Sequence, residues 1–246
     1  MIQRFLFILF VACLPLAAAS DFDDANRKFE SNDFAGAAEA YEDLLASEGP
    51  RAAVFYNLGN SYQKLEKFGP AILAYERARL LTPRDPDLRA NLALARKAAA
   101  AFEESGLDPR LRAVIHFLSR NEWSWLVAGS ALFLGILMSV LGSVKPLSRG
   151  MRQLVAASCS LAGFLLIMGA TALSMTRGEA KRGVVLSESA TIRLSPFKAA
   201  EALGTPGPGR MVQLGEVNGE FCYIEVPGTT LRGWLAREDV AAVVLP

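Results

Sequence analysis

Two long apolar runs constrain the fold of this chain more than any other feature. The segments 123–144 and 154–175 contain no charged residue. At about 1.5 Å per helical residue, each is long enough to cross a hydrocarbon core of roughly 30 Å. We therefore expect two transmembrane helices. The composition, with 52% hydrophobic residues and a formal net charge of +1, also disfavours a nucleic-acid-binding protein.

The segment between these runs predicts their orientation. Residues 145–153 carry Lys145, Arg149 and Arg152 and no acidic residue. Short loops rich in Lys and Arg stay on the cytoplasmic side of a membrane. We therefore expect residues 145–153 to form a cytoplasmic loop, with both flanking regions on the other side.

The N-terminus predicts the same topology independently. Residues 1–19 combine one Arg, an apolar run over 5–14 and three consecutive alanines, which is the layout of a secretory signal peptide. A second interpretation treats the residues before Cys13 as a lipidation motif. Either way we expect a two-span protein of the bacterial inner membrane, with both its N-terminal and C-terminal domains in the periplasm.

Small residues recur along the first apolar run. Ala131, Gly135, Ser139 and Ser143 follow one another at intervals of four. Such a stripe lets another helix approach closely, so we expect it to face the second membrane helix or a separate membrane protein. Because neither run contains a charged residue, the sequence argues against a pump or a channel.

The N-terminal region contains a helical repeat. Around "FYNLGNSY" the packing residues occur at the offsets of the 34-residue tetratricopeptide repeat; they are Phe55, Leu58, Gly59, Tyr62, Ala71, Tyr75, Ala78 and Pro83. A weaker copy precedes them, and a single capping helix follows. We expect an all-α array over residues 20–105 of about two and a half repeats. Arrays this short are marginally stable, which favours support from the membrane domain or from a partner.

The resemblance to tetratricopeptide proteins implies a binding role. In that family, peptides bind in a groove lined by the first helix of each repeat. The corresponding residues here are Tyr56, Asn60, Gln63 and Lys64, which we expect to face away from the packing residues. An ordinary solvated helix face is an equally good interpretation.

The array is also polarised in charge. Residues 21–48 contain nine acidic against two basic residues, and residues 51–97 contain nine basic against four acidic residues. This asymmetry favours either steering of a charged partner or simple attraction between neighbouring repeats.

A short amphipathic segment connects the array to the first apolar run. Within residues 106–122, the apolar side chains of Leu111, Val114, Ile115 and Leu118 recur at helical spacing. We expect a helix lying on the bilayer surface. His116, the only histidine in the chain, belongs to it. The sequence offers no second ligand for a metal site there and no catalytic set around the imidazole.

The C-terminal region changes to short β-rich runs separated by Gly and Pro turns. Residues 183–246 therefore predict a small all-β barrel, and they resemble bacterial SH3-like domains. That resemblance implies binding of peptides or cell-wall polymers through an aromatic surface at Phe221, Tyr223 and Trp234. The alternative is that these aromatic residues belong to the barrel's core. Cys222 alternates with the apolar residues of its strand, so we expect it to be buried and unreactive.

The order of these parts is more specific than any one of them. Signal peptide, short repeat array, membrane hairpin and SH3-like domain together resemble the BatE-type aerotolerance proteins. The resemblance implies work alongside membrane-anchored von Willebrand A-domain proteins and a MoxR-type ATPase, and it supplies no catalytic residues. We expect a non-enzymatic periplasmic scaffold without metal or cofactor. The alternative is a cell-wall reader in which the SH3-like domain binds peptidoglycan and the repeats are spacers.

Overall fold

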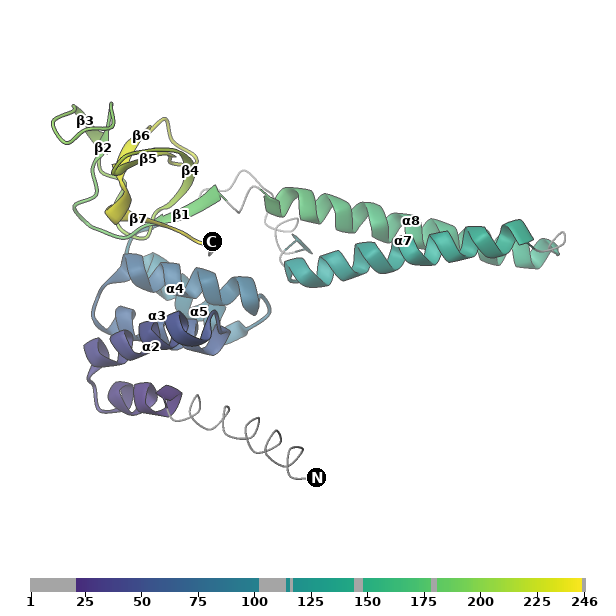
Figure 1. Cartoon of the computed structure of the whole chain (residues 1–246), viewed down its shortest axis with the longest axis horizontal. Coiled ribbons are helices and arrows are strands. Elements are labelled where there is room, and N and C mark those ends of the chain that lie inside the picture. Colours follow the sequence, from purple (N-terminus) through teal and green to yellow (C-terminus); the bar gives the residue numbers. More distant parts are fainter. Residues whose placement is uncertain (1–20, 102–113, 116, 144–147, 178–180, 245–246) are drawn as a thin grey trace, which may run out of the picture. The chain divides into compact units, whose positions relative to one another are not determined.

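The computed structural model of the chain describes residues 21–101, 114–115, 117–143, 148–177 and 181–244 (Figure 1). The chain divides into two compact units, one of Met1–Gly106 with Lys181–Pro246 and one of Leu107–Ala180. The predicted signal peptide, Cys13, His116 and most of the predicted surface helix over 106–122 lie outside the described residues.

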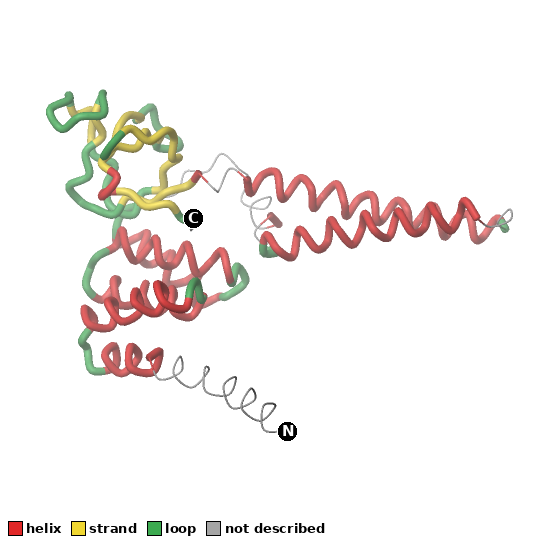
Figure 2. The backbone as a smooth tube through the Cα atoms, in the orientation of Figure 1, coloured by secondary structure: helices red, strands yellow, loops and turns green. Residues whose placement is uncertain are grey.

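The N-terminal part of the first unit is a stack of helices. Residues 21–30 are helical and are followed by α2 (Phe34–Glu48), α3 (Ala52–Lys64), α4 (Phe68–Leu81) and α5 (Pro86–Ala98) (Figure 2). Successive helices from α2 to α5 pack on each other. The sequence defines where α2 and α5 begin, because Asp33 and Asp85 accept hydrogen bonds from the free backbone N–H groups of the first helical turn.

Gly59 marks the closest approach between α3 and α4. A Cβ atom at this position would lie 2.5 Å from the ring of Tyr75, which is far inside van der Waals contact. The glycine therefore costs about 1 kcal/mol of helix propensity and permits Tyr75 to be fully buried. Close packing of α3 against α4 therefore explains why a glycine stands at this helical position, as the repeat pattern predicts.

The C-terminal part of the first unit is one antiparallel sheet of seven strands in the order β3-β2-β6-β5-β4-β1-β7. The strands are β1 (Arg182–Val185), β2 (Ile192–Arg193), β3 (Ala202–Gly204), β4 (Met211–Asn218), β5 (Phe221–Glu225), β6 (Arg232–Ala236) and β7 (Val240–Ala242).

This sheet is open, whereas the sequence predicts a small β-barrel. The strands curl around one another (Figure 2), but the two outermost strands, β3 and β7, do not pair with each other. Both are only three residues long. We call this part the sheet domain.

The interior of the sheet domain follows the alternation of its strands. Ile192, Ile224 and Leu235 are fully buried there, and Cys222 and Val226 lie on the same side as Ile224. The expectation that Cys222 is buried among apolar residues is confirmed. Burial raises the pKa of its thiol, so the thiol stays protonated and unreactive at neutral pH.

The helices and the sheet domain share one hydrophobic core. Ile72 of α4 belongs to the same cluster of buried residues as Val184, Met211 and Val243 of the sheet domain. The contact is close at Gly69, where a Cβ atom would lie 2.3 Å from the carbonyl oxygen of Leu186. The sequence predicts two separate domains over 20–105 and 183–246, whereas the structure joins them in one compact unit.

The second unit consists of α7 (Arg120–Ser143) and α8 (Arg149–Arg177), which pack along each other. Both are long and apolar enough to cross a membrane, and within their most apolar windows only 6% and 11% of the residues are buried. A surface of large exposed apolar side chains suits hydrocarbon rather than water.

The contact between α7 and α8 does not use the predicted stripe of small residues. Ala131, Gly135 and Ser139 are exposed, and a Cβ atom at Gly135 would meet nothing within 4 Å. The helices meet instead at Gly169 of α8, where a Cβ atom would lie 2.6 Å from Val127. The side chain of Ser143 lies outside the described residues.

Candidate partner-binding face

The four residues predicted to bind a partner lie on α3, the first helix of the second repeat. The side chains of Tyr56, Asn60 and Gln63 are half-buried, and that of Lys64 is exposed. We use the name first-helix face for the solvent-facing sides of the helix over 21–30, of α3 and of α5.

Three of these four residues also contact the packing residues, unlike the sequence expectation. Tyr56 packs against the shared core. The hydroxyl of Tyr75 lies 2.7 Å from Oδ1 of Asn60 and 2.9 Å from Oε1 of Gln63. The reason is helical geometry: residues 56, 60 and 63 form a stripe adjacent to the packing stripe rather than opposite to it.

Asn91 of α5 completes the network. Its Nδ2 donates to the hydroxyl of Tyr56 at 2.9 Å and to Oδ1 of Asn60 at 3.1 Å. Oδ1 of Asn60 therefore accepts from both neighbouring helices, α4 and α5. The network ties the first-helix face to the interior of the helix stack.

The same network occurs one repeat length earlier in the chain. Oδ1 of Asn26 accepts from the hydroxyl of Tyr41 at 2.6 Å and from Nδ2 of Asn57 at 3.0 Å. Asn26, Tyr41 and Asn57 correspond to Asn60, Tyr75 and Asn91. Sequence reasoning missed Asn26, Asn57 and Asn91, although this recurrence of asparagines was a visible signal for them.

The tyrosines in these networks act as hydrogen-bond donors. Burial is the main cause that raises the pKa of Tyr75, and the neighbouring Tyr56 raises it further. Burial also raises the pKa of Tyr41. Both hydroxyls therefore stay protonated at neutral pH, so each can donate its proton to an asparagine oxygen.

Lys64 is the most exposed of the four residues, but it is also anchored. Its ammonium group lies 6.0 Å from the centre of the Phe34 ring at the start of α2, within the range of a cation–π contact. This contact holds a positive charge beside the half-buried amides of α3.

The aromatic residues predicted for the SH3-like domain separate into two kinds. Phe221 is only 6% exposed and so has little surface for a ligand. Tyr223 and Trp234 are half-buried cross-strand neighbours whose rings meet edge to face with their centres 5.5 Å apart. Of the predicted aromatic surface, these two rings retain accessible area.

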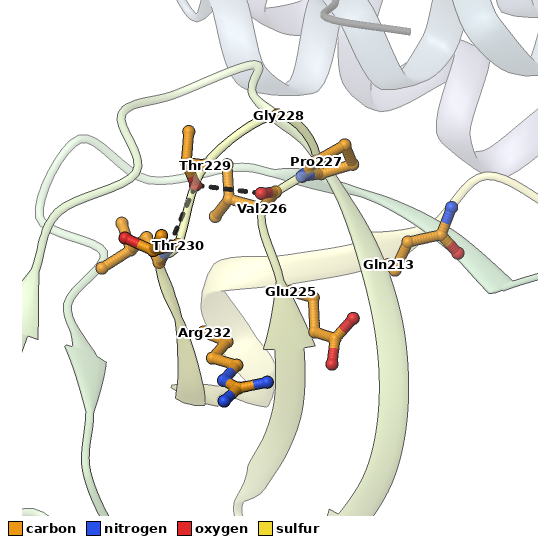
Figure 3. Close-up of a pocket in the computed structure, with 9 residues that line it drawn as sticks. Gln213, Glu225, Val226, Pro227, Gly228, Thr229, Thr230 and Arg232 are labelled. Carbon is orange, nitrogen blue, oxygen red and sulfur yellow. Dashed lines mark hydrogen bonds between the residues drawn. The ribbon is translucent and has the colours of Figure 1, made fainter. Parts of the chain in front are cut away.

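A separate pocket lies at the turn between β5 and β6 (Figure 3). Thr229 organises this turn: its hydroxyl donates to the carbonyl of Val226 at 2.9 Å and accepts from the backbone N–H of Leu231 at 3.1 Å. Glu225 and Arg232 line the pocket from paired strands.

Two features of the described residues bear on metal binding and acid–base chemistry. Within them, no group of three or more His, Cys, Asp or Glu side chains is placed to hold a metal ion. Glu76 has a strongly lowered pKa because arginines surround it. Its side chain is fully buried and therefore inaccessible to a substrate.

No protein-family model matches this chain, and no curated protein sequence matches it significantly.

Proposed function

We propose that this protein is a non-enzymatic, membrane-anchored scaffold that binds a partner protein through the first-helix face. We propose further that the helical part is a tetratricopeptide array and that the sheet domain is SH3-like. We also propose a BatE-type role, in which the protein works in a Bat/MoxR envelope-stress complex. In that setting the partners are membrane-anchored von Willebrand A-domain proteins.

One observation carries the proposal: the segments before and after the two apolar helices form one compact unit with a shared core. If both α7 and α8 cross the membrane, this unit can assemble only when both segments lie on the same side. The hairpin would then anchor this compact unit to the membrane. The half-buried amide side chains on its first-helix face support recognition of a partner.

The side of the membrane follows from charge. Lys145, Arg149 and Arg152 lie between the two apolar helices, and the positive-inside rule assigns this connection to the cytoplasm. We therefore propose that the compact unit lies on the periplasmic side of the bacterial inner membrane. A cysteine-specific, membrane-impermeant label tests this: a cysteine introduced at Lys64 should react in intact spheroplasts, and one introduced at Arg149 should react only after lysis.

The test of partner binding places a photocrosslinking amino acid at Lys64 in protein expressed at its native level. The matched control places it at Glu39, an exposed residue of α2 outside the first-helix face. We expect one discrete protein adduct from position 64 and none from position 39. The captured protein is identified by mass spectrometry and must bind the purified full chain. The same adducts from both positions, or none from position 64, would contradict the proposal.

A second candidate function is cell-wall binding through Tyr223 and Trp234, because these rings remain partly accessible on neighbouring strands. Co-sedimentation of the detergent-solubilised full chain with purified peptidoglycan tests it. Retention that is lost in Trp234→Ala would favour this function, and a full chain that stays in the supernatant would exclude it. The full chain is needed because the sheet domain shares its core with the helices.

A further inference from the structure

One row of charged and polar side chains crosses the sheet domain. Antiparallel pairing aligns one residue from each of the neighbouring strands β1, β4, β5 and β6; these residues are Arg182, Gln213, Glu225 and Arg232. Residues directly opposite each other in a sheet lie on the same face, with their Cα atoms about 4.5–5.5 Å apart. We call these four residues the polar row.

Glu225 and Arg232 place a negative and a positive charge side by side in this row. Both side chains are exposed, and both line the pocket at the turn between β5 and β6 (Figure 3). Gln213 lines the same pocket. Charge-assisted hydrogen bonds are the strong ones, so the pocket suits a ligand that carries one anionic and one cationic group close together.

The aromatic pair of the sheet domain adjoins the polar row on the same face. Tyr223 precedes Glu225 by two residues on β5, and Trp234 follows Arg232 by two residues on β6. Because the side chains of a strand alternate between the two faces of a sheet, residues two apart share one face. Tyr and Trp are enriched at the boundary between membrane and water. This face therefore combines charged and aromatic groups that suit a membrane surface.

The chain itself limits how far the start of the polar row can lie from a membrane helix. α8 ends at Arg177, and the row begins five residues later, at Arg182. Five residues span at most about 18 Å, even when fully extended. If α8 crosses the membrane, as the proposed function holds, the first residue of the row stays close to the membrane surface. The ligands present there are phospholipid headgroups.

We propose that Glu225 and Arg232 bind the headgroup of a zwitterionic phospholipid of the membrane that anchors the protein. The guanidinium of Arg232 donates hydrogen bonds to the phosphate, and the carboxylate of Glu225 pairs with the ammonium group. Only two carbon atoms join phosphate and ammonium in such a headgroup, which suits two side chains on directly paired residues. The inference rests on the proposed membrane anchorage and does not involve the first-helix face.

An anionic phospholipid fits the same site less well. The carboxylate of Glu225 lies on the strand next to Arg232 and repels a headgroup whose only charge is negative. The site should therefore distinguish zwitterionic from anionic lipids, and this selectivity separates headgroup binding from general attraction between a basic protein surface and a membrane.

The test uses the full chain in lipid nanodiscs, with a photocrosslinking amino acid at Thr230, an exposed residue of the same pocket. One set of nanodiscs contains phosphatidylethanolamine and phosphatidylcholine in equal amounts, and the other contains phosphatidylglycerol alone. Mass spectrometry of the irradiated protein measures the fraction that carries a lipid adduct. We expect this fraction to be at least fivefold higher in the zwitterionic set. The matched control places the same amino acid at Lys198, which is exposed and pairs with Glu220 beyond the other end of β5, and it should show less than a twofold difference.

Two variants, each with the crosslinker at position 230, assign the selectivity to the charged pair. Glu225→Gln removes the partner of the ammonium group, so the ratio between the two sets should fall below twofold. Arg232→Gln removes the partner of the phosphate and should lower the yield in the zwitterionic set at least fivefold. Glu216→Gln, at an exposed position of β4 outside the pocket, removes one negative charge and should leave the ratio unchanged.

The outcomes separate this inference from the proposed function. Equal yields in the two sets, a higher yield with phosphatidylglycerol, or no lipid adduct at position 230 would each overturn headgroup binding. In intact cells, an adduct of position 230 with peptidoglycan instead of phospholipid would also overturn it and would favour the second candidate function. The scaffold function is decided separately, by the photocrosslinking result at Lys64.

Discussion

Helices α2 and α4 occupy equivalent places in two successive repeats, yet only α4 is packed against the sheet domain. Both begin with Phe, and both bury a tyrosine at the same position, Tyr41 and Tyr75. Along α2 the remaining side is largely exposed, whereas α4 buries most of its residues. The Phe and Tyr that the two helices share thus preserve the packing within each repeat. The residues at which α2 and α4 differ determine what else each helix contacts.

Two substitutions between the repeats and one change of environment accompany the difference. Ala35 of α2 corresponds to Gly69, which permits the close approach of the Leu186 carbonyl. The exposed Glu42 corresponds to the buried Glu76, and Asp43 corresponds to Arg77, which donates to the carbonyl of Ala242 at 3.0 Å. The second repeat is therefore adapted to the sheet domain, and the first repeat is not.

This adaptation explains how so short an array is stabilised. Repeat proteins bury their core by stacking, and α5 is not followed by a second helix within the described residues of the array. The sheet domain supplies the missing contact: a Cβ atom at Gly209, which has φ of +75°, would lie 2.4 Å from Ile72 and 3.3 Å from Ala101. The support expected from a membrane domain or a partner comes, in this structure, from the chain's own C-terminus.

The largest effect is expected at the buried carboxylate. Glu76 accepts hydrogen bonds from Arg79 at 2.8 Å and 3.1 Å and pairs with Arg96 of α5. Removing one partner of a buried ion pair typically costs about 3–5 kcal/mol. We expect Glu76→Gln to reduce the free energy of unfolding by about that amount, measured by urea denaturation of the full chain in detergent.

The matched control in the first repeat is Glu42→Gln. Glu42 is exposed and accepts from Tyr62, an interaction that a glutamine oxygen can also accept, so its substitution should cost less than about 0.5 kcal/mol. Equal effects of the two substitutions would show that the two repeats do not differ as described.

Lowering the pH should reduce the stability of the second repeat by protonating Glu76. Burial alone would raise the pKa of Glu76, but Arg79, Arg96 and Arg182 outweigh it and lower the pKa from 4.5 to about 2. Because the folded pKa is below the unfolded one, the stabilisation is complete above about pH 4.5 and is lost as the pH falls toward 2. At about 1.4 kcal/mol per pKa unit, the loss is roughly 3 kcal/mol.

Hydrogen exchange of α4 peptides, followed by mass spectrometry between pH 5 and pH 2.5 and corrected for the intrinsic exchange rate, measures this loss. Protection of α4 should fall over that range in wild type. In Glu76→Gln it should fall distinctly less, since the titrating group is gone. An unchanged acid response in the variant would assign the effect to another carboxylate.

The sequence predicted local features of this molecule and missed the contacts between distant segments. The apolar helices follow from uninterrupted hydrophobic runs, and the burial of Cys222 follows from strand alternation. The shared cluster to which Ile72 and Val184 belong has no local signal, because each residue fits an ordinary amphipathic element. The order of the seven strands is likewise a long-range property that no short pattern encodes.

The sequence predicted residues of the candidate site but not the hydrogen bonds between them. Asn60 was found because it occupies a known repeat position, but its hydrogen bonds to Tyr75 and Asn91 depend on the packing of three helices. The stripe at Gly135 was expected to face either the second membrane helix or a separate membrane protein, and the structure shows that it does not face α8. Regularly spaced small residues show where another helix could approach α7. The observed contact between α7 and α8 is instead set by the side chain of Val127 against the backbone at Gly169.

A methyl group at the helix–sheet contact should have a smaller effect than loss of the buried charge. In Gly69→Ala the new Cβ meets a backbone carbonyl, which cannot move as a side chain does. Overpacking of this kind costs typically about 1–3 kcal/mol. We expect a lower melting temperature for the full chain in differential scanning fluorimetry. Ala35→Val, at the corresponding exposed position of α2, should leave the melting temperature unchanged within error.

The smallest effect is expected at Arg77. Its guanidinium lies 5.9 Å from the ring centre of Phe55 and donates to Ala242 of β7, so it joins the helices to the edge of the sheet domain. A hydrogen bond from a charged group is worth about 1.5–3 kcal/mol, and burial already lowers the pKa of Arg77 and so offsets part of this gain. We expect Arg77→Ala to cost about 1 kcal/mol, mainly as faster hydrogen exchange in β7.

Asp43→Ala, at the equivalent position of α2, supplies the comparison. Asp43 is exposed and lines a surface pocket together with residues between 21 and 47, so exchange in β7 should not respond to its loss. If both substitutions accelerated exchange in β7 equally, Arg77 would act through the stability of the whole helix stack. An effect confined to Arg77→Ala would show that the second repeat holds the sheet domain by direct contact.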